Sequence, residues 1–123
     1  MCSLIWWVAC ESEVAPVVTI EHDAVNEQVP AEAPPATLTA SARPDGVDLH
    51  LTGLVSYCRP TPEFDATLTE GVLTLSVAPP TEPVSRCFGL HALDVEVEVG
   101  GEVRKVEVRR EGQLIAEGPV DRR

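Results

Sequence analysis

Cys87 and His91 are the residues whose types and spacing suit metal binding, because a thiol and an imidazole stand only four positions apart. A thiolate and an imidazole are ligands of blue-copper sites, which also need a second histidine and usually a weak axial methionine. From residue 36 onward the other histidine is His50, on a segment whose apolar and polar alternation directs it outward. The one methionine is Met1. We therefore predict no metal site and no cofactor, with both histidines solvated or hydrogen-bonded at the surface.

Catalysis by side chains has little support in the sequence. A hydrolase needs a nucleophile, a base and an orienting group that converge. Ser85, His91 and Asp94 lie close in sequence, but such proximity is common by chance, and the chain has no Gly-x-Ser-x-Gly turn or zinc-type histidine pair. We predict that the protein is not an enzyme.

The apolar run at residues 4–9 ends at Cys10. It resembles the end of a bacterial lipoprotein signal peptide, in which small residues such as Val8 and Ala9 precede a cysteine that is lipidated. The run is shorter than the usual 7–15 apolar residues, so residues 1–9 correspond to a degenerate or truncated signal. The resemblance implies lipid on Cys10, a membrane anchor, and a place in the bacterial cell envelope at the outer membrane or facing the periplasm. A cytosolic protein with an apolar N-terminal strand is the alternative.

Under this resemblance Cys2 leaves with the signal and Cys10 carries lipid, so two cysteines remain, Cys58 and Cys87. An even number of remaining cysteines in an oxidising compartment indicates a disulfide, here one bond between the two. Two reduced, buried cysteines are the alternative. The run from Cys87 to His91 also resembles the spacing in the cupredoxin loop, which implies a second alternative, a copper-binding β-sandwich with those two residues as ligands. Copper ligation by Cys87 and the disulfide exclude each other.

Charge separates the N-terminal segment from the rest of the chain. Residues 10–35 contain six carboxylates, four prolines and no lysine or arginine, a composition typical of a solvated tether. Residues 17–20 could instead add a short strand, and the sequence does not decide between the two. The whole chain has 20 acidic and 9 basic residues and a net charge of −11. Nucleic acids and anionic lipid headgroups are therefore excluded as partners.

The remainder, residues 36–120 with a tail at 121–123, has the pattern of an all-β domain. Short alternating segments are separated by turn residues, which predicts seven strands at 37–43, 47–56, 63–69, 72–78, 92–99, 103–110 and 113–118. Four hairpin turns are expected at Asp45-Gly46, Glu70-Gly71, Gly100-Gly101 and Glu111-Gly112. The pairings they predict are, in chain order, Ala42 with Leu49, Leu68 with Leu73, Leu93 with Val108, and Ile115 with Val108. The pattern resembles secreted immunoglobulin-like or fibronectin-like modules, which implies a small two-sheet sandwich of about seven antiparallel strands.

Two loops, at residues 57–62 and 78–83, are stiffened by prolines, and a disulfide between Cys58 and Cys87 would tie them together. Stiff loops lose little entropy on binding, and tyrosine and arginine are enriched at interface hot spots. The candidate partner contacts are Tyr57, Arg59, Arg86 and Phe88. A plain crossover between sheets is the alternative reading of both loops. The sequence as a whole predicts a cell-envelope lipoprotein that acts as a non-catalytic binding or structural module for a protein or another envelope component.

Overall fold

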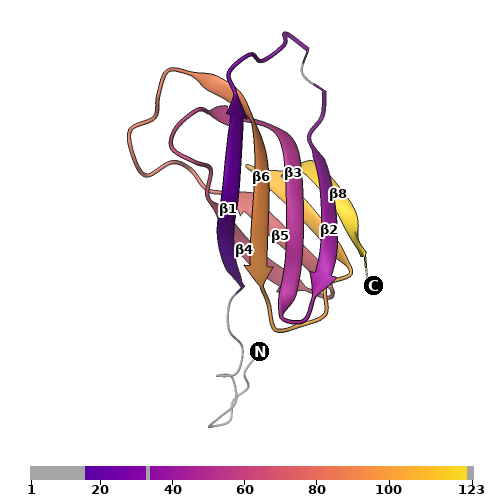
Figure 1. Ribbon diagram of the computed structural model, residues 1–123. Helices are drawn as coiled ribbons and strands as arrows, with labels where there is room; N and C mark the ends of the chain where they lie inside the picture. Colours follow the sequence, from indigo (N-terminus) through magenta and orange to yellow (C-terminus); the bar gives the residue numbers. More distant parts are fainter. Residues whose placement is uncertain (1–15, 33, 122–123) are drawn as a thin grey trace.

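The computed structural model describes residues 16–32 and 34–121 (Figure 1). Residues 1–9, expected to be a signal segment, and Cys10, the expected lipidation site, lie outside the described residues. Strands are the regular elements of the described chain, and no described helix has the length and apolar character needed to cross a membrane. In chain order the strands are β1 (Val17–Asn26), β2 (Thr37–Arg43), β3 (Gly46–Tyr57), β4 (Phe64–Thr69), β5 (Val72–Val77), β6 (Phe88–Glu98), β7 (Lys105–Arg110) and β8 (Gln113–Asp121).

The strands form one curled mixed sheet in the order β1-β6-β3-β2-β8-β7-β5-β4. The all-β prediction is confirmed, but the expected pair of separate antiparallel sheets is replaced by a half-barrel. Two pairings are parallel: β5 with β7, and a short contact between β2 and β8 at Ala40–Val120 and Ser41–Asp121. That short contact joins the two halves of the sheet, and the curl brings the edge strands β1 and β4 close to each other (Figure 1).

β1 is the strand that the sequence analysis assigned mainly to a tether. It includes the stretch 17–20 left open there, and it continues to Asn26. It pairs antiparallel with β6, from Val17 opposite Glu98 to Asn26 opposite Leu90. Pairing with β6 satisfies the backbone donors and acceptors, and Val18 and Ile20 pack against the core. These gains are long-range, so a composition typical of a tether did not reveal them.

The hairpin of β4 and β5 matches its prediction, with Leu68 opposite Leu73 and Phe64 opposite Val77. Its turn residues, Glu70 and Gly71, have φ values of 52° and 83°. Positive φ at both positions is what a type I′ turn requires. Local turn chemistry and strand alternation were therefore sufficient to predict the register of this hairpin.

The hairpin of β2 and β3 exists, but its register differs from the predicted one by two residues. Ala42 pairs with Val47 and not with Leu49. Pro44 and Asp45 are the two central turn residues, without the positive φ of a type I′ turn. A proline at the first of these positions suits a type I turn. Because side chains alternate with a period of two, a shift of two leaves every side chain on its predicted face.

Gly46 is needed for close approach and not for the turn. It pairs with Arg43 in β2 and, on its other side, with Glu98 in β6. A Cβ atom at this position would overlap the backbone carbonyl oxygen of Val97. The neighbouring strand β6, whose Val97 is 51 residues further along the chain, therefore restricts this position to glycine.

The predicted hairpin between 92–99 and 103–110 is wrong. β6 lies between β1 and β3, so Leu93 pairs with Leu51, whereas Val108 lies in the other half of the sheet and pairs with Ala116. The segment between β6 and β7 crosses from one half to the other. Its Val103 is buried, and the Arg104 side chain donates from Nη2 to the backbone oxygen of Glu70 at 2.6 Å.

The last hairpin, β7 with β8, forms at the predicted turn, but the predicted pairing of Ile115 with Val108 is wrong. A bulge between Val108 and Arg109 leaves Ile115 out of the ladder, and Ala116 takes its place opposite Val108. An extra residue on one strand is what such a bulge inserts.

Bulges also flank β6 on both neighbouring strands. One lies in β1 between Ile20 and His22, and the other in β3 between Thr52 and Leu54, where Gly53 has a φ of 84°. Each bulge reverses the alternation that follows it. As a result Leu54 points into the core, and Asp23 shares the inner face of β1 with Ile20. The core is a single cluster with members from seven of the strands: Leu38, Ala40, Val47, Leu49, Leu51, Leu54, Phe64, Leu73, Leu75, Leu93, Val95, Val97, Val103, Val106, Val108 and Ala116.

Candidate functional site

The candidate site lies where β3 ends and β6 begins, at the end of the sheet that carries the two proline-rich loops. Cys58 and Cys87 face each other there with their Sγ atoms at disulfide distance and their Cα atoms 5.3 Å apart. Two backbone hydrogen bonds reinforce the junction, from Cys58 N to Cys87 O at 2.8 Å and from Ser85 N to Arg59 O at 3.1 Å. The loops are thus fixed to each other as the disulfide prediction requires.

His91 differs from its prediction as a surface side chain, because it is completely buried. It stands on the inward row of β6, next to Leu93. Its Nδ1 lies 2.8 Å from Oδ1 of Asp23 on β1, and its Nε2 lies 2.9 Å from the backbone oxygen of Tyr57 at the end of β3. One imidazole therefore links three neighbouring strands at the level of the loops.

The contacts of His91 fix where its hydrogens lie. A backbone carbonyl oxygen only accepts, so Nε2 carries a hydrogen and donates it to Tyr57. A second hydrogen must lie between Nδ1 and the carboxyl group of Asp23, which is 12 % exposed. The described part of the chain contains no buried side-chain nitrogen or oxygen without a partner. Both ring nitrogens of His91 are therefore occupied, and neither is available to a ligand or as a catalytic base.

A copper centre at Cys87 and His91 does not fit this arrangement. Cys87 is held at disulfide distance from Cys58, and both nitrogens of His91 are engaged. Among the described residues, one group of three side chains has donor atoms close enough to hold a metal ion: Glu27, Cys58 and Cys87. Two of these three are the paired cysteines. Blue copper requires a free thiolate and a free imidazole nitrogen, and the geometry provides neither.

A groove of about 340 Å³ opens beside the disulfide. The rings of Tyr57 and Phe88 stack in it with centroids 4.7 Å apart and an angle of 26° between their planes. Val55 and Val77 line it from the ends of β3 and β5, and Arg110 donates from Nη2 to the backbone oxygen of Val55 at 2.7 Å. The remaining lining residues are Ser56 of β3 and, from the loops and turns, Pro60, Thr61, Glu63, Ala78, Pro79, Pro80, Thr81, Glu82 and Glu111.

The structure brings together two of the four predicted contact residues. Tyr57 and Phe88 line the groove, whereas Arg59 lines a separate shallow hollow with Asp23, and Arg86 is exposed in the loop before Cys87. Both aromatic residues stand next to a cysteine in the sequence, so the disulfide prediction already implied their proximity. Arg110 was missed, because nothing local indicates that the end of β7 reaches β3. Asp23 was missed as well, because the bulge in β1 turns it inward.

A larger hollow, of about 740 Å³, lies at the opposite end of β3. Its walls are the turn at 42–47 and the segment 98–103, together with Val17. It contains no aromatic, histidine or cysteine side chain among its lining residues, and it is open to solvent. We therefore place the candidate site in the smaller groove, where the aromatic pair and the fixed loops coincide.

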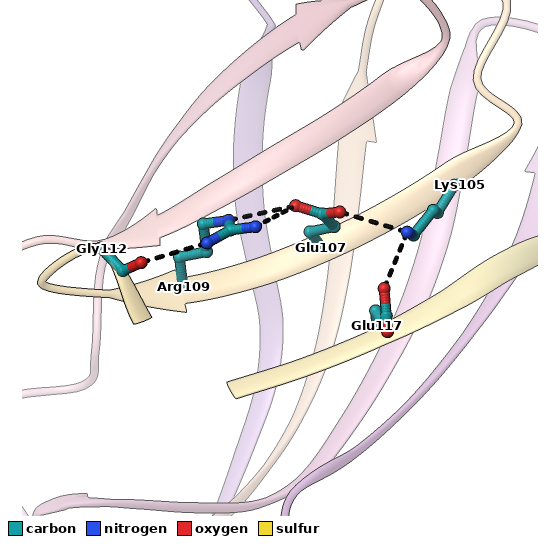
Figure 2. Close-up of polar contacts among 5 residues, drawn as sticks. All are labelled: Lys105, Glu107, Arg109, Gly112 and Glu117. Atoms are coloured by element: carbon teal, nitrogen blue, oxygen red, sulfur yellow. Dashed lines mark hydrogen bonds and ion pairs between the residues drawn. The ribbon is translucent and has the colours of Figure 1, made fainter. Parts of the chain in front are cut away.

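Ion pairs join several of the other charged side chains on the outer face of the sheet. Figure 2 shows Glu107 of β7 between Arg109 and Lys105, with Glu117 of β8 beside Lys105. Hydrogen bonds from Arg109 and then from Lys105 lower the pKa of the Glu107 carboxyl below its ordinary value of 4.5. The pKa of Lys105 is raised, mainly by its hydrogen bond to Glu117. These side chains neutralise one another, so we assign them to the surface and not to a site.

The other half of the sheet carries a second set of outward pairs. His50 Nδ1 lies 2.6 Å from Asp94 Oδ1, with both side chains about half exposed, which agrees with the surface position predicted for His50. Arg43 forms ion pairs with Asp48 and Glu96. Asp94 and Glu96 of β6 thus lie against side chains of β3 and β2 respectively.

Comparison with known proteins gives no relative to reason from. A scan against models of protein families, a search of curated proteins and a search of solved structures each produced no match. The function of this chain must therefore be argued from the groove and its surroundings.

Proposed function

We propose that this chain is a cell-envelope lipoprotein whose β domain is a non-catalytic binding module, with the groove at Tyr57 and Phe88 as its contact site. The observation that carries the proposal is the stacked aromatic pair in a groove whose loops are held by the Cys58–Cys87 junction. A preformed apolar groove with a few polar groups is the usual form of a binding site. Loops fixed in advance lose little conformational entropy when a partner binds.

Export is supported by the two cysteines. Disulfides persist in oxidising compartments such as the periplasm and are rare in the cytosol. The geometry at Cys58 and Cys87 suits a disulfide, and the run before Cys10 resembles a lipoprotein signal. These two observations are independent, and they favour the same compartment.

The position of β1 suggests how such a module would face its surroundings. Six residues lie between Cys10 and Val17, and they reach at most about 20 Å when fully extended. Val17 pairs with Glu98 at the end of the sheet farthest from the groove, while Asn26 lies near the loops (Figure 1). A strand of ten residues spans about 33 Å. A lipid on Cys10 would therefore hold one end near the membrane and present the groove on the far side.

The immunoglobulin-like architecture is part of the same proposal. The strands β1-β6-β3-β2 and β8-β7-β5-β4 form two halves that share one core. Such halves offer loops at both ends, where binding surfaces are commonly placed. The parallel pairings and the continuous sheet distinguish this chain from a standard two-sheet module.

The test is the fate of the full chain, with its N-terminal run, in a bacterial host that has an outer membrane. We expect a membrane-associated product whose intact mass corresponds to cleavage before Cys10 and addition of lipid, with Cys58 and Cys87 alkylated only after reduction. A Cys10→Ala variant should lose the lipid and leave the membrane fraction. An unprocessed, unlipidated wild-type chain with freely alkylated thiols would overturn the proposal.

A further inference from the structure

We propose that the groove binds a basic peptide segment of a partner protein, by taking an arginine or lysine side chain that is flanked by proline or other apolar residues. The inference rests on the proposed binding function and specifies the chemistry of the partner. Three features of the groove carry it: an exposed aromatic surface, a rim of uncompensated carboxylates, and rigid loops of proline.

The aromatic surface is concentrated in this groove. Of the three aromatic residues in the described chain, Phe64 is buried in the core, and the other two form the stacked pair. Phe88 remains 52 % exposed although it stacks on Tyr57. An exposed aromatic face attracts cations, and an arginine plane stacks on it. The apolar stem of lysine or arginine would pack against Val55 and Val77, the aliphatic side chains in the same walls.

The rim of the groove is acidic. Glu63, Glu82 and Glu111 are exposed lining residues from three different segments, and none of the described residues forms an ion pair with them. Arg110 is the basic residue among the lining residues, and its guanidinium is directed to the backbone oxygen of Val55. The rim therefore presents unpaired negative charge, which suits a cationic ligand.

The shape of the groove favours a peptide. Its volume of about 340 Å³ is enough for one or two side chains. Pro60, Pro79 and Pro80 line it together with the aromatic pair. Grooves lined by aromatic residues accept extended, proline-containing segments, because such segments are already extended before binding. The net charge of −11 would accelerate the approach of a basic partner.

The experiment is a titration of the full chain against fluorescein-labelled nonapeptides, followed by fluorescence anisotropy. The probe is a peptide of alternating arginine and proline; the comparison peptides carry glutamine or glutamate in place of arginine. We expect saturable binding of the arginine peptide, at least about tenfold weaker binding of the glutamine peptide, and no binding of the glutamate peptide. Free arginine amide should compete only at much higher concentration than the unlabelled peptide.

Variants locate the binding. Phe88→Ala, and a triple Glu63→Gln, Glu82→Gln, Glu111→Gln variant, should each weaken binding of the arginine peptide at least about tenfold. The matched control removes the same charge elsewhere, with Glu21→Gln, Glu70→Gln and Glu98→Gln, and should change affinity less than about threefold. The glutamate variants should keep the wild-type unfolding midpoint, because these carboxylates are exposed. Phe88→Ala also loses the stacking on Tyr57, so its binding is measured where circular dichroism shows that it is folded.

Each contrary outcome has a definite meaning. Equal weakening by the control variant would show general attraction to an acidic protein and overturn the assignment to the groove. Equal affinity for the arginine and glutamine peptides would overturn the inference that the partner is basic. Equal affinity for arginine amide and the arginine peptide would overturn the inference that the ligand is a peptide segment. No binding of the arginine peptide would also overturn the inference. None of these results changes the lipid, membrane and thiol measurements that test the proposed function.

Discussion

Replacing Asp23 by alanine should destabilise the protein far more than replacing Asp94, although both carboxylates lie against a histidine. The Asp23–His91 pair joins β1 to β6 with 0 % of His91 and 12 % of Asp23 exposed. The Asp94–His50 pair joins β6 to β3 with about half of each side chain exposed. The nitrogen-to-oxygen distances are similar, at 2.8 Å and 2.6 Å. Burial is therefore the main difference between the two pairs.

The magnitude follows from what each replacement leaves behind. Asp23→Ala leaves Nδ1 of the buried His91 imidazole without a hydrogen-bond partner. Removal of one member of a buried pair costs about 3–5 kcal/mol of folding stability. Because Asp23 keeps a little contact with water, we expect the lower end, about 3 kcal/mol. Asp94→Ala leaves His50 free to bond to water and should cost about 0.2–1 kcal/mol. Asp23→Asn should cost less than Asp23→Ala, because the amide can still hydrogen-bond to Nδ1.

The assay is equilibrium unfolding in urea, with the disulfide intact and at constant pH, for Asp23→Ala, His91→Leu and the double variant. The double-mutant cycle gives the coupling between the two side chains, and the same cycle with Asp94→Ala and His50→Leu is the control. A buried pair predicts a coupling of more than about 1 kcal/mol for the first cycle and a smaller one for the second. Equal costs for Asp23→Ala and Asp94→Ala would refute the argument that burial makes this imidazole dependent on its carboxylate.

Three further predictions concern the backbone, the ion pairs and the disulfide. Gly46→Ala should cost about 1–3 kcal/mol because its Cβ would overlap backbone, whereas Gly100→Ala, with open space around it, should be near neutral; chemical unfolding of both variants decides this. Since the folded pKa of Glu107 is lowered, its ion pairs stabilise the fold fully above about pH 4.5 and lose that effect as pH falls through the lowered value. Glu107→Gln should therefore flatten the acid side of the stability curve, and an unchanged acid limb would contradict this. Replacing Cys58 and Cys87 by serine should lower the free energy of unfolding by about 3–4 kcal/mol. Reductant should lower the free energy of unfolding of the wild type by a similar amount and leave that of the variant unchanged.

The parts of the fold that the sequence predicted correctly are those set by neighbouring residues. The β4–β5 hairpin is the clearest case, because Glu70-Gly71 adopts the positive φ values that fix the turn, and the turn then fixes the register. The first hairpin shows the limit of this reasoning. A shift of two residues keeps every side chain on the same face of the sheet, so the apolar pattern fits both registers equally well.

Turn signals do not by themselves distinguish a hairpin from a crossover. Gly100 and Gly101 suggested a tight hairpin, but the chain at this point passes from one half of the sheet to the other. A sign of the error was present in the sequence, because an antiparallel hairpin that pairs Leu93 with Val108 also sets Arg104 opposite Val97, on the apolar face. In the structure Arg104 is exposed and its guanidinium reaches Glu70.

The candidate site was predictable only where covalent chemistry constrained it. Pairing of Cys58 with Cys87 places their neighbours Tyr57 and Phe88 side by side, and the structure stacks those two rings. The glutamates of the rim come from segments that are distant in sequence and carry no shared motif. Their meeting depends on the way the sheet curls.

The sequence by itself determined the all-β class, the inward and outward faces of most strands, the local turns and the two cysteines that meet, because these depend on alternation, backbone φ and cysteine count. Only the tertiary structure decided that the acidic segment after residue 16 becomes β1, that the two halves join into one mixed sheet, and that a bulge turns Asp23 toward a buried His91. The physical reason is that strand pairing and burial are long-range interactions. Their free energy depends on which segments meet, and a segment considered alone has no information about its neighbours.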